Sequence, residues 1–204
     1  RRCLDAGEQV MLLLNRRGFA PFVLCPMCGW VAYCRNCQVT MTYHAKGACL
    51  SCHYCNARRS VPAVCDDCQF HHLLFLGAGT QKIEDYLART FPNSRVERMD
   101  LDTTAGKGSH ARILGRLAAR EIDILIGTQM IAKGHDYPGV TLVGVVNGDT
   151  SLSLPDFRAA ENTFQLLTQV AGRAGRGPCP GRVIIQTYRP NHYAIRYSVA
   201  QDYE

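Results

Sequence analysis

The chain has 204 residues, a formal net charge of +6 and 47% hydrophobic residues, which suits one globular domain of ordinary size with a smaller second one. The longest unbroken aliphatic run, residues 10–14, is far too short to cross a membrane, so we expect no membrane partner. Nothing resembles a secretory signal, and the eleven cysteines therefore point to a reducing compartment, the cytoplasm.

The first expected elements frame a cysteine-rich segment. Residues 1–9 are typical of the end of a helix that stops at Gly7, and because the pattern begins in mid-helix we expect that the chain was cut from a longer protein. Residues 10–15 form a continuous apolar run, typical of a strand buried on both faces of a parallel sheet. Residues 73–79 are predicted to be a second buried strand, so the segment between them is interpreted as an insertion.

Beyond residue 79 the pattern alternates between helices and strands. Helices are predicted at 80–91, 108–122, 157–175 and 192–204, and strands at 94–100, 123–128, 141–149 and 181–187. The helix at 157–175 has Phe157, Ala160, Phe164, Leu167 and Ala171 on one face. This alternation predicts an α/β fold with a mainly parallel, doubly wound sheet. We predict a discontinuous domain of residues 1–20 and 73–204 and a small module of residues 21–72.

The small module is dominated by C-x-x-C pairs. Two such turns that face each other form a tetrahedral thiolate cage for zinc, and eight cysteines suffice for two zinc ions. With four protein ligands per metal, no position stays open for water, so both zinc sites should be structural. A disulfide scaffold is the alternative, and the regular pairs disfavour it. The four pairs are Cys25/Cys28, Cys34/Cys37, Cys52/Cys55 and Cys65/Cys68.

Spacing leaves two questions about this module open. Cys49 stands three residues before Cys52, so two overlapping C-x-x-C pairs are present and spacing cannot choose between them. Spacing also cannot decide whether the pairs nest, interleave or follow in sequence. Binding of two zinc ions by eight thiolates would cancel much of the formal positive charge, so overall basicity favours nucleic acid only weakly.

Three stretches outside the module carry polar residues suited to chemistry: residues 126–143, 155–166 and 169–177. In the last of these, Arg173 and Arg176 are three residues apart among small residues. A glycine-flanked arginine at a helix end can approach a phosphate closely, and its planar fork matches phosphate oxygens. Two of the stretches have a simpler interpretation: residues 126–143 could be an ordinary βαβ turn, and residues 169–177 a solvated basic helix end.

These stretches resemble a known family. Residues 127–147, GTQMIAKGHDYPGVTLVGVVN, are similar to motif V of superfamily 2 helicases, and residues 169–177, QVAGRAGRG, are similar to motif VI. The cysteine array follows VMLLLNRRGFAP and precedes LGAGTQKIEDYLARTFP and LPDFRAAE. With these features the chain resembles, over essentially all its length, the bacterial family of primosomal replication-restart DNA helicases. Asn162 departs from the family's usual PDFRAAER.

The resemblance implies a ligand set for zinc. In the family the pairs nest, which assigns Cys25, Cys28, Cys65 and Cys68 to one site. It assigns Cys34, Cys37, Cys52 and Cys55 to the other. Cys3, Cys49 and Cys179 fall outside the family's ligand pattern.

The resemblance also implies an ATP-dependent, 3′ to 5′ DNA helicase that remodels stalled replication forks. Such an enzyme has two RecA-like lobes with ATP and Mg²⁺ between them. The stretches at 77–80 and 106–109 do not fit the phosphate-loop pattern, and no Walker A or Walker B motif is present. The chain is therefore interpreted as the second lobe with the zinc module, and alone it should not hydrolyse ATP.

Roles at the nucleotide follow from the same resemblance. Arg173 and Arg176 would act as arginine fingers on the γ-phosphate. Gln169 would help to sense the nucleotide. Gly134 and Asp136 would lie near the ribose and the loop that couples the two sites.

Thr128, Gln129 and Lys133 would face the DNA backbone. The implied partners are forked DNA with single-strand–duplex junctions, other primosome proteins and single-strand-binding protein, in the bacterial cytoplasm. Two alternatives stay open: a non-catalytic, zinc-dependent DNA- or protein-binding module on an α/β scaffold, or another zinc-bearing superfamily 2 translocase.

Overall fold

The computed structural model describes residues 1–14, 22–44, 47–76, 80–100, 103–104, 106, 108–132, 137–177 and 179–202. Two compact units divide the chain. The sheet unit comprises Arg1–Arg17, Gly79–Asn147 and Gln165–Gln186. The cysteine-rich unit comprises Gly18–Ala78, Gly148–Phe164 and Thr187–Glu204, so it draws on more of the chain than the module predicted at 21–72. The predicted domain boundaries stay a prediction.

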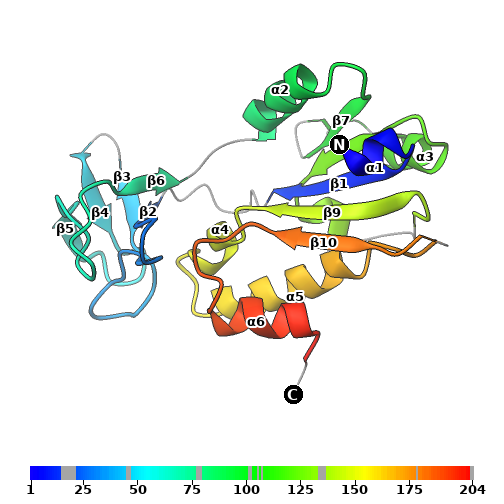
Figure 1. Cartoon of the computed structure of the whole chain (residues 1–204). Helices are drawn as coiled ribbons and strands as arrows, with labels where there is room; N and C mark the ends of the chain where they lie inside the picture. Colours follow the sequence, from blue (N-terminus) through cyan, green and yellow to red (C-terminus); the bar gives the residue numbers. More distant parts are fainter. Residues whose placement is uncertain are drawn as a thin grey trace. The chain divides into compact units, whose positions relative to one another are not determined.

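The sheet unit is built on five parallel strands in the order β10-β9-β1-β8-β7 (Figure 1). Val10 in the central strand pairs with Ile124 on one side and with Leu142 on the other. This sheet confirms the predicted α/β class with its mainly parallel strands. The strands are β1 (Gln9–Leu14), β7 (Val96–Met99), β8 (Ile124–Gly127), β9 (Val140–Val146) and β10 (Arg182–Ile185).

Both faces of the central strands are buried, as the continuous apolar run of β1 predicts. On one face Val10 and Leu14 pack with Ile124 and Ile126, and this cluster includes residues of α1 (Arg2–Asp5) and α2 (Thr80–Thr90). Successive strand residues point to opposite faces. On the other face, Met11, Leu13 and Leu125 are almost wholly inaccessible to solvent.

Of the remaining helices, α3 (Ser109–Ala118), α5 (Ala159–Ala171) and α6 (Tyr193–Ala200) differ from their predicted bounds at the ends. The short 3₁₀ helix η2 (Gln129–Ala132) and the short α4 (Asp149–Leu152) were not predicted. The helix predicted at 157–175 starts two residues later and ends at Ala171. Its buried face is Ala159, Thr163, Leu166, Leu167 and Val170, whereas Phe157 is 76% exposed. The predicted apolar face was therefore only partly right: Leu167 is buried, but Ala160, Phe164 and Ala171 are half-buried, because the buried stripe lies to one side of the predicted one on the helix.

The cysteine-rich unit contains two small antiparallel sheets (Figure 1). In one, β2 (Phe22–Leu24) pairs with β6 (Leu74–Leu76); in the other, β4 (Cys49–Ser51) lies between β3 (Thr42–His44) and β5 (Arg58–Ser60). The prediction that residues 73–79 add a buried strand to the parallel sheet was wrong. A short apolar run does not reveal its partner, and Phe75 within it is 52% exposed. Residues 77–79 lie outside the described residues.

The core of this unit is small and includes the cysteines themselves. Val23, Val39, Met41 and Leu50 form one buried cluster with Ala32, Cys34 and Cys52, and Trp30 and Tyr43 pack against it. Within the described part of residues 22–76, only one more small cluster is present, of Phe22, Leu24 and Val31. So few apolar side chains supply little hydrophobic free energy, and modules of this length usually depend on metals or disulfides. This segment therefore needs a cross-link of some kind.

Candidate functional site

Each of the four C-x-x-C pairs forms the same backbone turn. In each, the amide of the first cysteine donates to the carbonyl five residues later, at 2.8–2.9 Å. The residue four positions later donates back to the cysteine carbonyl and has a positive φ, a conformation open to glycine and, less easily, to asparagine and glutamine. These residues are Gly29 (φ 76°), Gln38 (56°), Asn56 (58°) and Gln69 (61°). The repeated turn aims both sulfurs of each pair to one side.

The strand pairing explains why the cysteine pairs nest. Leu24, at the end of β2, pairs with Leu74, at the start of β6, so Cys25 and Cys28 meet the pair that precedes β6. Inside this bracket, β3 and β4 pair antiparallel and bring the turns at Cys34 and Cys52 together. The structure thus groups Cys25, Cys28, Cys65 and Cys68, and separately Cys34, Cys37, Cys52 and Cys55.

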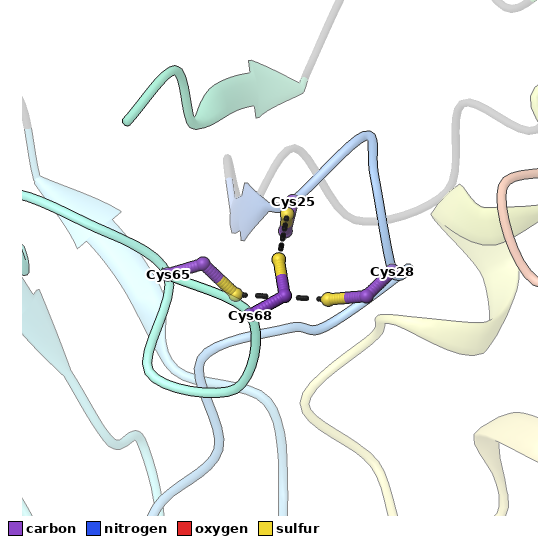
Figure 2. Close-up of side chains that lie close together, drawn as sticks. All are labelled: Cys25, Cys28, Cys65 and Cys68. Atoms are coloured by element: carbon purple, nitrogen blue, oxygen red, sulfur yellow. Dashed lines mark hydrogen bonds between the residues drawn. The ribbon is translucent and has the colours of Figure 1, made fainter. Parts of the chain in front are cut away.

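In the first group the four sulfurs point toward one another (Figure 2). The Sγ of Cys25 lies 3.5 Å from that of Cys68, and the Sγ of Cys28 lies 3.6 Å from that of Cys65. Cys25 and Cys65 are buried, while Cys28 and Cys68 are exposed.

In the second group the Sγ of Cys34 lies 3.6 Å from that of Cys55. Two donors also face these sulfurs: the Tyr54 amide, 3.4 Å from the Cys52 Sγ, and the Asn36 side-chain amide, 3.8 Å from the Cys55 Sγ. Such N–H donors stabilise a thiolate ligand in the same way that outer hydrogen bonds support other metal ligands.

Both groups have the geometry of a four-thiolate zinc cage. Within each, all four sulfurs lie within 4.8 Å of one another. A zinc–sulfur bond of about 2.3 Å in a tetrahedron separates two sulfurs by about 3.8 Å. The sulfur–sulfur distances of 3.5–3.6 Å in the two groups are close to this value and much longer than a disulfide bond. The two groups therefore fit two structural zinc ions. Cys49, which lies in β4, belongs to neither group. Cys3 and Cys179 also lie outside both groups.

The thiols of each group share their protons unequally. The Ala57 amide, helped by the Cys34 thiol, lowers the pKa of Cys55 to about 7, whereas the hydrogen bond to Cys55 raises the pKa of Cys37 to about 12. In the first group burial opposes ionisation of Cys25, yet the amides of Cys28 and Met27 outweigh it and lower the pKa of Cys25 to about 7. Each group therefore offers a partly ionised sulfur at neutral pH, the form that binds a metal.

The glycine-rich turn after α5 is held tightly within the sheet unit. The Gly175 amide donates to the Val140 carbonyl at 3.2 Å, and φ of Gly175 is +73°. A Cβ on Gly175 would overlap the backbone nitrogen of Gly181, and one on Gly177 would lie 2.6 Å from the Pro138 carbonyl oxygen. The turn can approach the starts of β9 and β10 this closely only because these positions are glycine.

This turn carries the two arginines that the sequence singles out. Arg173 is half-buried, and its positive charge partly offsets the burial that raises the pKa of Tyr137. The exposed Arg176 donates from Nε to the Gly172 carbonyl at 2.7 Å. Gln169 is exposed one turn earlier on α5. The turn that carries Arg173 lies close to the segment that precedes β9.

The segment between β8 and β9 crosses the sheet unit, because the two strands are parallel and it must return from the carboxyl to the amino edge. Thr128 is buried, and its amide faces the Met99 carbonyl at 3.4 Å. Gln129 begins η2 and is half-buried. Lys133, Gly134 and Asp136 lie outside the described residues.

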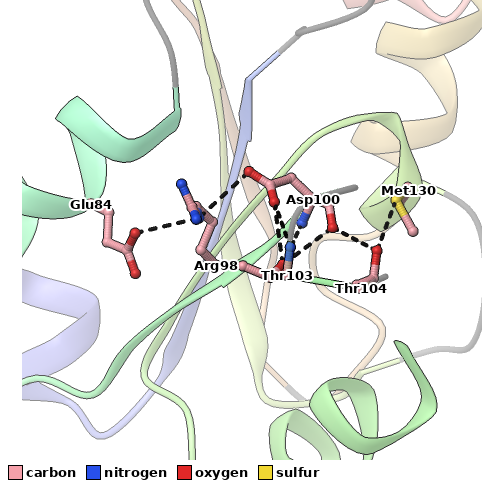
Figure 3. A network of polar contacts seen from close by, with 6 residues as sticks. All are labelled: Glu84, Arg98, Asp100, Thr103, Thr104 and Met130. Atoms are coloured by element: carbon pink, nitrogen blue, oxygen red, sulfur yellow. Dashed lines mark hydrogen bonds and ion pairs between the residues drawn. The ribbon is translucent and has the colours of Figure 1, made fainter. Parts of the chain in front are cut away.

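A polar network at the carboxyl edge of β7 was not anticipated from the sequence (Figure 3). The carboxylate of Asp100, a wholly buried residue, accepts from the Thr103 amide at 3.1 Å and lies 3.5 Å from Nε of Arg98. The Thr104 hydroxyl donates to the Asp100 carbonyl at 2.5 Å and contacts the Met130 sulfur at 3.9 Å. The network therefore ties the turn after β7 to η2. Its signal in the sequence is Asp100 with a threonine, Thr103, three residues later, a pattern that favours a turn held by side-chain–backbone hydrogen bonds.

Arg98 extends this network to α2, since its Nε also lies 3.4 Å from Glu84.

Among the residues that the structure describes, no helix is long and apolar enough to span a membrane.

Two family models match the chain. Residues 34–59 match the PriA DNA helicase Cys-rich region (CRR) domain, and residues 66–178 match the helicase conserved C-terminal domain. The second match covers more than half of the chain and includes the motif V and motif VI stretches.

Curated relatives extend the similarity to almost the whole chain. The replication restart protein PriA of Bacillus subtilis is 54% identical over 97% of this chain and 25% of its own length. That of Haemophilus influenzae is 46% identical over 98% of this chain and 28% of its own length. The chain thus spans about a quarter of the length of these relatives. Among solved structures, the Pyrococcus furiosus Hef helicase domain is 16% identical over 97% of this chain and 25% of that chain, with a TM-score of 0.39, a likeness that supports no conclusion.

The family matches and the structure agree on the type of domain. The parallel sheet, the motif stretches and the cysteine groups are those expected of a RecA-like helicase lobe with a small cysteine-rich insertion that can bind zinc. The chain belongs to the helicase conserved C-terminal domain family and is homologous over almost its entire length to the replication restart protein PriA.

Proposed function

We propose that this chain is the second helicase lobe and zinc module of an ATP-dependent DNA helicase that remodels stalled forks and restarts replication. The observation that carries the proposal is the turn after α5, where Arg173 and Arg176 are presented on a backbone fixed by Gly175 and Gly177. A pure scaffold has no need of a rigid turn with two arginines beside small residues.

We propose Arg173 and Arg176 as the groups that stabilise negative charge on the transferred phosphate. The rigid turn supports this role, because a preorganised cation loses little free energy in reorientation during reaction. Gln169, on the preceding turn of α5, would help to sense the nucleotide, and Gly134 and Asp136 would lie near the ribose. The other lobe would supply the phosphate loop and the Mg²⁺ ligands, so the 204-residue chain alone should not hydrolyse ATP.

On the DNA side we propose Thr128, Gln129 and Lys133 as contacts to the backbone. The two proposed arginines lie in the turn after α5, and Gly175 of this turn is hydrogen-bonded to Val140 at the amino end of β9. Thr128 and Gln129 instead follow the carboxyl end of β8. The segment between β8 and β9 connects these edges. It is therefore suited to couple DNA binding to ATP hydrolysis, with 3′ to 5′ movement as the proposed direction.

The eight grouped cysteines would hold two structural zinc ions, which supply the cross-link that the small core of the cysteine-rich unit lacks. Forked DNA, other primosome proteins and single-strand-binding protein are the proposed partners, and the bacterial cytoplasm is the proposed location. The homology to PriA supports these assignments.

The test compares Arg176→Ala with Arg182→Ala in the full-length protein. Arg182 is an exposed arginine on β10, outside the turn. An arginine finger accelerates phosphoryl transfer by about 10³–10⁵ in GTPases. Arg176→Ala should therefore remove most DNA-stimulated ATPase activity and change DNA affinity only a few-fold, whereas Arg182→Ala should change neither. Normal ATP hydrolysis with strongly weakened DNA binding would show that Arg176 contacts the DNA backbone, and the proposal would fail.

A further inference from the structure

A groove in the cysteine-rich unit is rich in arginine. It has a volume of about 360 Å³ and its polar lining is Tyr33, Arg35, Asn36, Arg58 and Arg59. The buried Cys34 and Met41 and the half-buried Ala57 also line it. This volume is within the range of pockets that hold a small ligand. No acidic side chain lines the groove.

The second cysteine group brings the walls of the groove together. Arg35 and Asn36 are the two residues between Cys34 and Cys37, whereas Arg58 and Arg59 begin β5, directly after the turn that starts at Cys52. Because Cys34 and Cys55 meet at 3.6 Å, the two turns cannot separate while the group is intact. The groove is therefore built by the same cysteines that fit a zinc ion.

The cations of the groove are of two kinds. Arg59 donates to Asp66 at 3.0 Å and lies over the Trp30 ring at 5.7 Å, so its guanidinium is held in place. The side chains of the exposed Arg35 and Arg58 make no hydrogen bond or ion pair with any residue that the structure describes. Two arginines that pair with no carboxylate among the described residues, beside one groove, favour an anionic ligand.

An aromatic ring completes the groove. Tyr33 is 36% exposed, and its hydroxyl accepts a hydrogen bond from Nη1 of Arg189 at 3.1 Å. Arg189 in turn packs so closely on Gly29 that a Cβ there would lie 2.7 Å from its Cγ. The ring is therefore fixed from behind, as a platform for stacking requires.

We propose that this groove binds one nucleotide unit of a single-stranded nucleic acid, with phosphates at Arg35 and Arg58 and a base against Tyr33. Arginines that follow the backbone and an aromatic ring that stacks on a base are the two elements of sequence-tolerant single-strand binding. The proposal rests on the proposed function and deepens it, since it gives the zinc module its own contact with the unwound strand. The competing explanation is that Arg35 and Arg58 only neutralise the charge of four thiolates around zinc.

The experiment uses the zinc-loaded 204-residue chain and a fluorescently labelled deoxythymidine oligonucleotide. Its binding is measured by anisotropy across a salt series, for the chain itself and for Arg35→Gln/Arg58→Gln. The control, Arg182→Gln/Arg196→Gln, removes the same charge at exposed positions on β10 and α6. The groove variant should bind about tenfold more weakly or worse. The slope of its log affinity against log salt concentration should become shallower by about 1.4, since each of the two lost phosphate contacts on a single strand contributes about 0.7. The control should keep the slope.

Tyr33 provides a second, independent variant pair. Tyr33→Phe loses the hydrogen bond from Arg189 but keeps the ring, so it should bind more tightly than Tyr33→Ala, which should lose about tenfold. An unchanged salt slope in the arginine variant, or loss of zinc from it, would overturn the proposal; the second result would show that the arginines serve the thiolates. These outcomes do not depend on ATP hydrolysis, so they are distinguishable from failure of the Arg176 test.

Discussion

Replacement of Cys52 by serine, compared with Cys49→Ser, tests which of two overlapping pairs binds metal. Cys52 is 1% exposed, belongs to the second sulfur group and is part of the core cluster, whereas Cys49 lies in β4 outside both groups. With two groups of four sulfurs, Cys52→Ser should lower the zinc content from two ions per chain to one. Cys49→Ser should leave it at two.

The loss of metal from that group should unfold its surroundings. Structural zinc binding releases about 10–16 kcal/mol in zinc-finger peptides at neutral pH, which equals or exceeds the total stability of a typical domain. The core beside the group, including Val39, Met41 and Leu50, is too small to replace that free energy.

The assay is elemental analysis of protein purified under reducing conditions, together with limited proteolysis of residues 34–59. Cys52→Ser should be cleaved there rapidly, while Cys49→Ser should resist cleavage like the original chain. If Cys49→Ser loses zinc and Cys52→Ser keeps both ions, the grouping of sulfurs described above is wrong.

Three further predictions concern single side chains. Gly175→Ala should destabilise the chain by about 2–4 kcal/mol, because its positive φ is strained for alanine and the added Cβ would overlap neighbouring backbone. Gly172→Ala should cost under about 1 kcal/mol, because no atom would lie closer than 3.6 Å to its Cβ. Urea unfolding of the two variants compares the free energies. Asp100→Ala should cost about 2–3 kcal/mol by leaving buried partners unpaired, and an unchanged unfolding midpoint would contradict the network in Figure 3. Burial, aided by the charge of Arg189, lowers the pKa of His192 to about 4 from an ordinary 6.5. The unfolded chain therefore binds a proton that the folded chain does not, and the free energy of unfolding should fall as the pH falls from about 6.5 to 4. His192→Asn keeps a side-chain cap for α6 and should remove this pH dependence in urea titrations at pH 7 and 5.

How much of the site the sequence could reveal depends on whether the signal was local. The C-x-x-C turns are local: the residue at positive φ follows within four positions, and the pattern alone predicts two sulfurs aimed together. Nesting is not local, because it depends on the pairing of Leu24 with Leu74 across the whole cysteine-rich segment. Residue spacing carries no record of that pairing, so only the family resemblance could supply the order.

The same distinction explains the errors in the fold. The β1 run was correctly predicted as a strand buried on both faces, since its length and continuity are typical of the centre of a parallel sheet. Residues 74–76 carry a similar apolar signal over three positions, yet their partner is the antiparallel β2. The buried Asp100 was missed because an aspartate with a threonine three residues later predicts a local turn but not whether the chain folds over it.

The corrected pairing of β6 changes where the cysteine-rich segment enters the sheet unit. Since β6 is not part of the parallel sheet, the segment interrupts the connection from β1 to α2 rather than separating two neighbouring strands. The segment follows β1, which ends at Leu14, at the edge of the sheet where the parallel strands β7 and β8 also end. That edge holds the Asp100 network and Gln129, the proposed DNA contact. The insertion therefore lengthens one strand-to-helix connection of the sheet unit and leaves the order of its five strands unchanged.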